Sequence, residues 1–405
     1  MGMGICFFIL GLGTLLPWNF FMTALLYFQS RLNTTEWSNV TTEVPKEVPK
    51  EYYFNNWMTL LSQLPLLVFT LLNSFLYQRV SEGIRIAGSL VFILLLFILT
   101  AVLVKVPMDS ERFFSVTMAT IWFINSFGAV LQGSLFGLVG LLPQKFSAIF
   151  MSGQGLAGTF AAIAMLLAIA SDADFETAAL GYFITPCVGT LVTLFSYLLL
   201  PRLAKVDPSP EGPKGAFLPM EQVEKGQAKA SVKEVFKKIW VMAFCVTFVF
   251  TVTLSVFPAV TADVRTSSPG GNWERFFISV CCFLFFNVSD WLGRSVTTVI
   301  KWPRKDSRLF PALVVSRVVF VPLLMLCNVQ KRTFLPVWFS HDFVFAIIMI
   351  LFALSSGYFV CLSMSYAPQL VEQKDAETAG ALMTFFLSLG LSLGAGLSFL
   401  LRHLV

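Results

Sequence analysis

An aspartate and an arginine four residues apart, Asp290 and Arg294, interrupt a long apolar run and are the residues here best suited to binding chemistry. The run begins near Phe276 and ends at the basic cluster that starts with Lys301. A helix of that length crosses a hydrocarbon core of about 30 Å. A charge inside the membrane is costly, so it must face the protein interior or a water-filled cavity. Residues i and i+4 share one helix face, so each charge can neutralise the other.

Two interpretations of this pair are open. The pair could only hold helices together, or it could belong to a polar face that lines the path of a substrate, which is the interpretation we favour. Other polar side chains within apolar runs are Gln132, the neighbours Trp18 and Asn19, and Gln63. Together they suit a polar, uncharged solute. Arg317 has no acidic residue in its own run, so we expect it to make a structural pairing.

The composition requires elements that cross a membrane. Apolar residues make up 56% of the 405 residues and charged residues 13%, and the mean hydropathy is +0.77. A soluble protein carries about 25% charged residues. The strands of a β-barrel would alternate apolar and polar residues over about ten positions, whereas the apolar runs here are continuous and longer. The sequence therefore predicts an all-α polytopic membrane protein.

The predicted transmembrane helices number eleven, counted as apolar runs of about 18 residues or more. They lie near residues 3–28, 54–78, 86–106, 114–141, 148–171, 177–200, 239–263, 275–300, 309–328, 342–367 and 378–401. A polar, proline-containing segment follows the sixth. We therefore divide the chain into a six-helix bundle at 1–200, a cytoplasmic linker at 201–238 and a five-helix bundle at 239–405. Ser231-Val-Lys-Glu234 has the pattern of a capping box that starts a helix leading into the seventh span.

The distribution of Lys and Arg predicts the orientation. Connections on the side of the linker hold about sixteen of these residues and those on the other side about ten, and the richer side faces the cytoplasm. The N-terminus is therefore expected in the cytoplasm and the C-terminus outside. The first outer connection carries two sequons, at Asn33 and Asn39, which predicts glycosylation there.

Other chemistry finds little support. The two histidines, His341 and His403, lie at predicted outer ends of spans, and no clustered acid and base set indicates an enzyme. Gly153-Gln-Gly155-Leu-Ala-Gly158 fits a dinucleotide pattern but begins a membrane span, so we interpret its glycines as sites of close helix packing. The net charge of +5 resides mostly in loops, which argues against nucleic-acid binding. We expect no metal or other cofactor.

Several stretches together resemble the equilibrative nucleoside transporter family, close to its vertebrate type 1 and type 2 members, and the choice between these two types stays open. The matching stretches are Gly11-Leu-Gly-Thr-Leu-Leu-Pro-Trp-Asn19, Leu131-Gln-Gly-Ser-Leu-Phe-Gly137, Ser152-Gly-Gln-Gly-Leu-Ala-Gly158, Asp290-Trp-Leu-Gly-Arg294 and Glu377-Thr-Ala-Gly-Ala381. The likeness covers essentially the whole chain. It departs in a shorter N-terminus and a shorter central linker, as expected of a trimmed chain.

The resemblance implies a fold like that of the major facilitator superfamily, with bundles of six and five helices around a central cavity. It implies facilitative, sodium-independent, bidirectional transport of purine and pyrimidine nucleosides such as adenosine and uridine across the plasma membrane. It further implies inhibition by nitrobenzylthioinosine-type and dipyridamole-type compounds. Whether nucleobases are also carried stays open.

Matched residue by residue, the resemblance implies that Asp290 and Arg294 bind the ribose hydroxyls and that Gln132 binds the base. It implies further substrate contacts from Leu15, Trp18, Asn19, Leu66 and Leu391. It implies an inhibitor pocket and outer gate formed by Met22, Gln63, Gly128, Phe257, Pro258, Phe283 and Asn287. Arg85 and Glu377 are the candidates for an inner gate.

Three alternatives remain. A proton-driven carrier needs a carboxylate that loads and releases a proton, whereas Arg294 should keep Asp290 ionised. A sugar-type facilitator usually carries a Gly-x-x-x-Asp-Arg pattern between its second and third spans, where this chain has Tyr77-Gln-Arg-Val-Ser-Glu-Gly-Ile-Arg85. A membrane enzyme acting on a nucleotide-linked substrate is the third alternative. The sequence favours the uncoupled nucleoside carrier.

Overall fold

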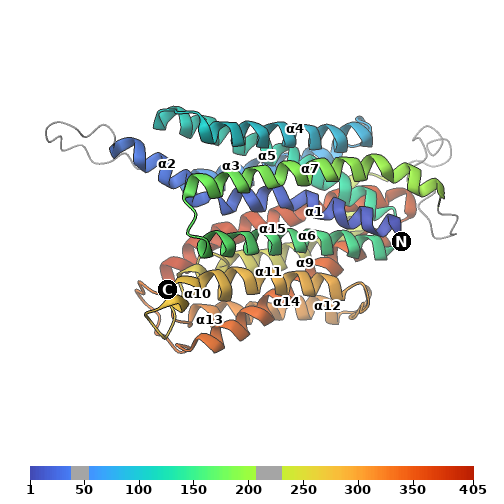
Figure 1. The fold of residues 1–405 in the computed structure, drawn as a ribbon. Helices are drawn as coiled ribbons and strands as arrows, with labels where there is room; N and C mark the ends of the chain where they lie inside the picture. The colour runs from blue at the N-terminus through green and yellow to red at the C-terminus, as the bar shows by residue number, and fades with distance from the viewer. Residues whose placement is uncertain (38–53, 207–229) are drawn as a thin grey trace.

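The computed structural model describes residues 1–37, 54–206 and 230–405, which form a bundle of helices (Figure 1). Within these residues the only strand-like pairings are two isolated bridges, such as the one between Val264 and Val329. The two termini lie at opposite ends of the bundle (Figure 1). We call these the N-terminal end and the C-terminal end. The predicted all-α fold is confirmed.

The helices before residue 207 alternate in direction between the two ends. They are α1 (Gly2–Thr23), its extension α2 (Leu25–Trp37), α3 (Phe54–Leu76), α4 (Glu82–Lys105), α5 (Ser110–Gly140), α6 (Gln144–Ala170) and α7 (Phe175–Val206). We call α1–α7 the first-half helices.

The helices after residue 229, which we call the second-half helices, are more interrupted. They are α9 (Val232–Val256), α10 (Asn272–Phe277), a π-helix (Ile278–Leu284), α11 (Phe285–Val296), α12 (Leu309–Ser316), a 3₁₀ turn (Arg317–Val319), α13 (Phe320–Met325), α14 (Asp342–Tyr366) and α15 (Ala376–Leu404). The eighth predicted span thus contains a π-helical turn, a feature that often marks functional sites and that hydropathy does not predict.

Ten helices among the described residues are long and apolar enough to cross a membrane. The ninth predicted span is the shorter apolar helix Leu309–Met325, which at 1.5 Å per residue reaches about 25 Å. The structure is thus compatible with eleven crossings, and that count stays a prediction.

Helical structure extends into the predicted linker from both sides. The α7 helix continues to Val206 and α9 begins at Val232, while residues 207–229 lie outside the described part of the chain. The backbone N–H of Glu234 donates to the Ser231 hydroxyl at 3.4 Å, which confirms the predicted helix start. The division at 201–238 stays a prediction.

Small residues bring the two sets of helices into direct contact. The α6 helix packs against α11, and α15 packs against α3 and α5. A Cβ added at Gly155 would lie 2.9 Å from the Trp291 Cα atom, and one added at Gly158 would lie 2.2 Å from the Asn287 side chain. This close approach of α6 and α11 confirms that the glycines of this stretch serve packing.

Glycines also seat α11 on α14, and so fix the position of the Asp290 backbone. A Cβ at Gly357 would lie 2.2 Å from the Asp290 carbonyl oxygen, and one at Gly293 would lie 2.3 Å from the Leu354 carbonyl oxygen. Because these neighbours are backbone atoms, they cannot move aside as a flexible side chain could. The α11–α14 contact therefore sets the depth and rotation of the helix that carries Asp290 and Arg294.

Arg317 is 2% exposed and lies among the second-half helices. Its guanidinium donates to the Ser355 and Thr253 hydroxyls at 2.9 and 3.2 Å, and to the carbonyl oxygens of Val249 and Phe352 at 3.2 and 3.1 Å. These bonds tie the helix Leu309–Met325 to α9 and α14. The expected structural pairing is confirmed, with hydroxyl and carbonyl oxygens as the partners.

The contact between α11 and α14 yields a test. We expect Gly357→Ala to lower stability by about 1–3 kcal/mol, because the added methyl group overpacks a backbone contact. Thermal unfolding of the detergent-purified protein measures the loss. Gly181→Ala on α7 is the matched control, because a Cβ there meets nothing within 4 Å. Equal melting temperatures for the two variants would contradict the assignment.

Candidate functional site

A cavity of about 1690 Å³ lies between the first-half and second-half helices. Its walls come from both sets, chiefly α1, α3, α5 and α6 on one side and α9, α11 and α15 on the other. It reaches the C-terminal end of the bundle, where Arg402 and His403 line it. A cavity shared by two sets of helices is the arrangement that a substrate path requires.

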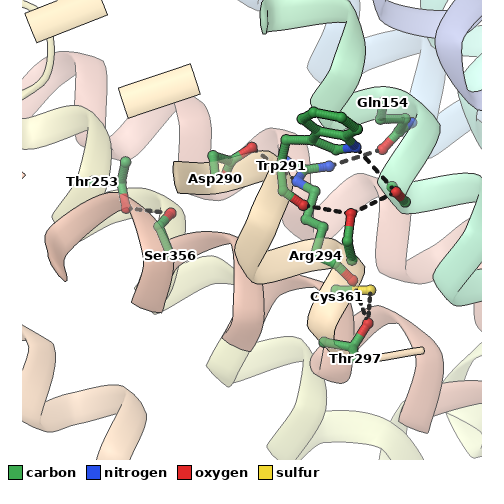
Figure 2. Close-up of polar contacts among 10 residues, drawn as sticks. Gln154, Thr253, Asp290, Trp291, Arg294, Thr297, Ser356 and Cys361 are labelled. Carbon is green, nitrogen blue, oxygen red and sulfur yellow. Dashed lines mark hydrogen bonds and ion pairs between the residues drawn. The ribbon is translucent and has the colours of Figure 1, made fainter. Parts of the chain in front are cut away.

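Arg294 lines the inner end of this cavity, and its predicted partner Asp290 lies one turn earlier on the same helix, α11 (Figure 2). The Arg294 Nε and Asp290 Oδ2 atoms are 3.0 Å apart, and the two side chains are largely buried. Arg294 lines the cavity, whereas Asp290 stands behind it and is not among the lining residues. The carboxylate thus neutralises a guanidinium that faces the cavity.

Gln154 on α6 is a site residue that sequence reasoning missed. The Arg294 Nη1 atom donates to its Oε1 atom at 3.2 Å, across the boundary between the two sets of helices (Figure 2). Arginine has donors only, so the amide must present its oxygen. Its Nε2 atom is then buried without a hydrogen-bond partner among the described residues. Gln154 lines the cavity, and the one available signal was its amide between two packing glycines.

Below Arg294, α6 and α11 are joined by further hydrogen bonds. The Trp291 Nε1 atom donates to the Ser152 hydroxyl at 3.2 Å, and the Ser152 and Ser295 hydroxyls are 2.8 Å apart (Figure 2). These contacts lie toward the N-terminal end, where α11 ends. Ser152, Trp291 and Ser295 do not line the cavity, whose lining extends in the other direction to Arg402 and His403 at the C-terminal end.

The structure brings nearly all the residues expected to bind substrate or inhibitors into this one cavity. Besides Arg294, its lining includes Leu15, Trp18, Asn19, Met22, Gln63, Leu66, Gly128, Gln132, Phe257, Pro258, Phe283, Asn287 and Leu391. They come from α1, α3, α5, the π-helix, α11 and α15, and from the segment after α9. Asp290 is the one residue of that expected set that does not line the cavity. It contacts a lining residue through its ion pair with Arg294.

The polar side chains that line the cavity differ in whether their hydrogen-bonding groups are already engaged within the protein. No hydrogen bond among the described residues engages the Gln132 amide, so both of its ends are available to a ligand. The Asn19 and Asn287 amides each donate to a carbonyl oxygen of their own helix at 2.8 Å. Trp18 stacks on Phe21, with ring centroids 5.3 Å apart. Gln132 is therefore the amide in this wall that is best able to form hydrogen bonds with a polar group of a ligand.

Arg85 and Glu377, the expected inner-gate residues, form an ion pair near the N-terminal end. Their closest atoms, Nη2 and Oε1, are 3.6 Å apart, and the pair joins α4 to α15. Arg85 also donates to the Ser134 hydroxyl at 2.9 Å and the Val80 carbonyl oxygen at 3.1 Å. The structure brings the two residues together, and their role as a gate stays a prediction.

One of the two sequon residues falls in the described part of the chain. Asn33 is on α2, which continues beyond α1 at the C-terminal end, and Asn39 falls outside the described residues. Glycosylation at both positions stays a prediction.

Comparison with known proteins shows which protein family this chain resembles. A family model described as nucleoside transporter matches residues 118–211 and 205–403. The chain is 54% identical to rat equilibrative nucleoside transporter 2, with 99% of this chain and 97% of the relative covered. It is 50% identical to human equilibrative nucleoside transporter 1, with 98% and 96% covered.

Solved structures support the fold alone. The human organic anion transporter MFSD10 superposes with a TM-score of 0.57 at 14% identity, covering all of this chain and 98% of its own. The major facilitator superfamily transporter FucP, in its outward conformation, gives a TM-score of 0.55 at 11% identity, with 98% and 97% covered. The expected likeness to the major facilitator superfamily fold is confirmed.

The Arg85–Glu377 contact yields a double-mutant test. We expect the losses of stability in Arg85→Ala and Glu377→Ala to be non-additive by about 0.5–3 kcal/mol, because the pair is largely buried. Thermal unfolding of both single variants and of the double variant measures this coupling. The exposed Lys105–Glu176 pair, 2.6 Å apart, is the matched control, and its losses should add. Additive losses at both pairs would remove the argument for an energetic link between α4 and α15.

Proposed function

The chain belongs to the equilibrative nucleoside transporter family, and from this premise we propose how its cavity carries a nucleoside. It is a facilitative nucleoside transporter. We propose that it moves purine and pyrimidine nucleosides, including adenosine and uridine, in either direction across the plasma membrane without sodium. The observation that carries this proposal is a paired Asp290 and Arg294 at the inner end of a cavity shared by both sets of helices.

The chemistry of the wall suits a nucleoside. A carboxylate can accept hydrogen bonds from two neighbouring hydroxyls, and a guanidinium can donate from a planar fork. Asp290 and Arg294 would therefore bind the ribose, which requires Asp290 to turn toward the cavity or the sugar to reach past Arg294. Gln132, whose amide offers both a donor and an acceptor, would bind the base edge. Trp18, with the aliphatic side chains of Leu15, Leu66 and Leu391, would cover the faces of the base.

Alternating access gives the two ends of the cavity different roles. With the C-terminus outside, as the charge distribution predicts, the cavity faces outward. Arg85 and Glu377 would then form the inner gate and would separate when the cavity opens to the cytoplasm. The lining residues nearer the C-terminal end, among them Met22, Phe257 and Phe283, would close the outer side and hold nitrobenzylthioinosine-type and dipyridamole-type inhibitors.

The first test is counterflow into proteoliposomes. With excess unlabelled nucleoside inside and no ion gradient, we expect rapid, transient accumulation of labelled adenosine and uridine that either inhibitor type abolishes. Protein-free liposomes give the background. Uptake that appears only with an inward proton gradient would mean a coupled carrier, and chemical conversion of the nucleoside without accumulation would mean an enzyme.

The ribose assignment predicts the effect of Asp290→Asn. Removing the negative charge leaves Arg294 buried without its counterion and removes an acceptor for the sugar, so we expect adenosine affinity to fall by about 10–100-fold. Isothermal titration calorimetry on the purified protein measures it. Asp306→Asn, in the exposed connection after α11, is the matched control. If Asp290→Asn bound adenosine with unchanged affinity, the ribose role would be wrong.

A further inference from the structure

The connection between α11 and α12, residues 297–308, exposes apolar side chains at the N-terminal end of the bundle. Val299 is 84% exposed, Ile300 52% and Trp302 59%. Three neighbouring apolar side chains at this exposure would be unfavourable in water. Since they follow directly on a membrane-spanning helix, the bilayer boundary is their natural surrounding. We call residues 297–308 the Trp302 loop.

Unpaired cations share this loop with the apolar residues. Lys301, Arg304 and Arg308 are exposed and Lys305 is half-buried. Asp306 is the loop's one carboxylate, which leaves a net charge of +3. No ion pair joins any of the four cations to a carboxylate within the described residues. Their charge is therefore available to an external anion.

Two tyrosines of α14 hold the loop backbone in place. The Tyr366 hydroxyl donates toward the carbonyl oxygens of Lys301 and Pro303, at 3.1 and 2.8 Å. The Tyr358 hydroxyl donates to the Trp302 carbonyl oxygen and accepts from its N–H. Pro303 is buried, which turns the chain inward between two exposed positions. The loop therefore presents its exposed side chains from a fixed backbone.

This anchoring also sets the depth of Trp302. Tyr358 lies two helical turns, about 12 Å, inside the end of α14 at Tyr366. The Trp302 backbone bonds to Tyr358 and its two neighbours bond to Tyr366, so it lies between these two levels near the end of a membrane-spanning helix, where tryptophan is enriched. Lysine and arginine side chains that begin at this level can extend toward the surface and reach lipid headgroups.

We propose that the Trp302 loop is a binding site for an anionic phospholipid. The indole and the exposed aliphatic residues would contact the upper acyl chains, while Lys301, Arg304, Lys305 and Arg308 would hold the phosphate and a second acidic group such as the carboxylate of phosphatidylserine. A lipid is the occupant that matches both halves of this surface. The site is independent of the nucleoside cavity, so it stands whether or not the transport proposal does.

Brominated lipids provide a direct test, because bromine in the upper acyl chain quenches a nearby indole. The full chain is placed in nanodiscs that contain brominated phosphatidylserine or brominated phosphatidylcholine at the same low mole fraction. The difference between wild type and Trp302→Phe isolates the fluorescence of Trp302. We expect the anionic lipid to quench Trp302 at a several-fold lower mole fraction, since each cation near the surface contributes about fivefold in affinity.

Two charge-neutralised variants distinguish a specific lipid-binding site from general electrostatic attraction between the protein and anionic lipid. Lys301→Gln/Arg304→Gln/Lys305→Gln/Arg308→Gln should lose the preference for the anionic lipid. Arg202→Gln/Lys233→Gln/Lys237→Gln/Lys238→Gln removes the same charge from exposed positions at the same end of the bundle and should retain it. Should the first variant fail to fold, as judged by thermal unfolding, Lys301→Gln/Arg304→Gln replaces it and should remove most of this several-fold preference.

Three results would overturn the proposal. Equal quenching by the two lipids would mean that the loop does not select charge. Absence of quenching by either lipid would place Trp302 in water or against another protein. An equal loss of preference in both neutralised variants would mean diffuse electrostatic attraction without a site.

Discussion

Buried positive charge is the constraint on which this bundle depends, because a guanidinium among apolar helices must find partners or destabilise the fold. Three buried arginines find their partners in three different ways. Arg317 is satisfied by hydroxyl and carbonyl oxygens of the second-half helices alone, so it stiffens that set. Arg85 pairs with Glu377 across the two sets. Arg294 pairs with Asp290 on its own helix and reaches Gln154 on the other set.

The contact between α6 and α11 allows close approach of the two sets of helices and is held by neutral hydrogen bonds. Where α6 meets α11, glycines let the backbones touch, and the hydrogen bonds among Ser152, Trp291 and Ser295 join neutral groups. Such bonds contribute modestly in membranes, about 0.6 kcal/mol on average. Within the second half, by contrast, the four donor contacts of Arg317 tie α9, α14 and the helix Leu309–Met325 together. At the α6–α11 contact the two sets are therefore joined by weaker bonds than those that Arg317 makes within the second set.

Hydropathy could predict most of the fold from the sequence, because a continuous apolar segment that crosses the lipid must satisfy its backbone hydrogen bonds internally and therefore forms a helix. It could not predict the π-helix Ile278–Leu284, which leaves the apolar pattern unchanged, or the extension of α7 to Val206, where the helix continues past the end of the apolar run. Within the site, Asp290 and Arg294 were conspicuous because charge is rare in apolar runs. Most of the cavity wall came from the family resemblance, since residues such as Gly128 and Leu391 look like ordinary packing positions. Gln154 escaped because its importance lies in a contact between helices that are 140 positions apart in sequence.

The placement of the charged partners bears on why transport can proceed without an ion gradient. Asp290 and Arg294 share one helix face, so their pairing can persist while the two sets of helices separate. The bond from Arg294 that crosses the boundary goes to the neutral amide of Gln154, and breaking it leaves no unpaired charge at the inner end of the cavity. The Arg85–Glu377 pair does cross the boundary near the N-terminal end, and under the proposed alternating access its separation would admit water to both charges. In this arrangement the ion pair between Asp290 and Arg294 does not have to break during the proposed cycle, which fits an uncoupled carrier.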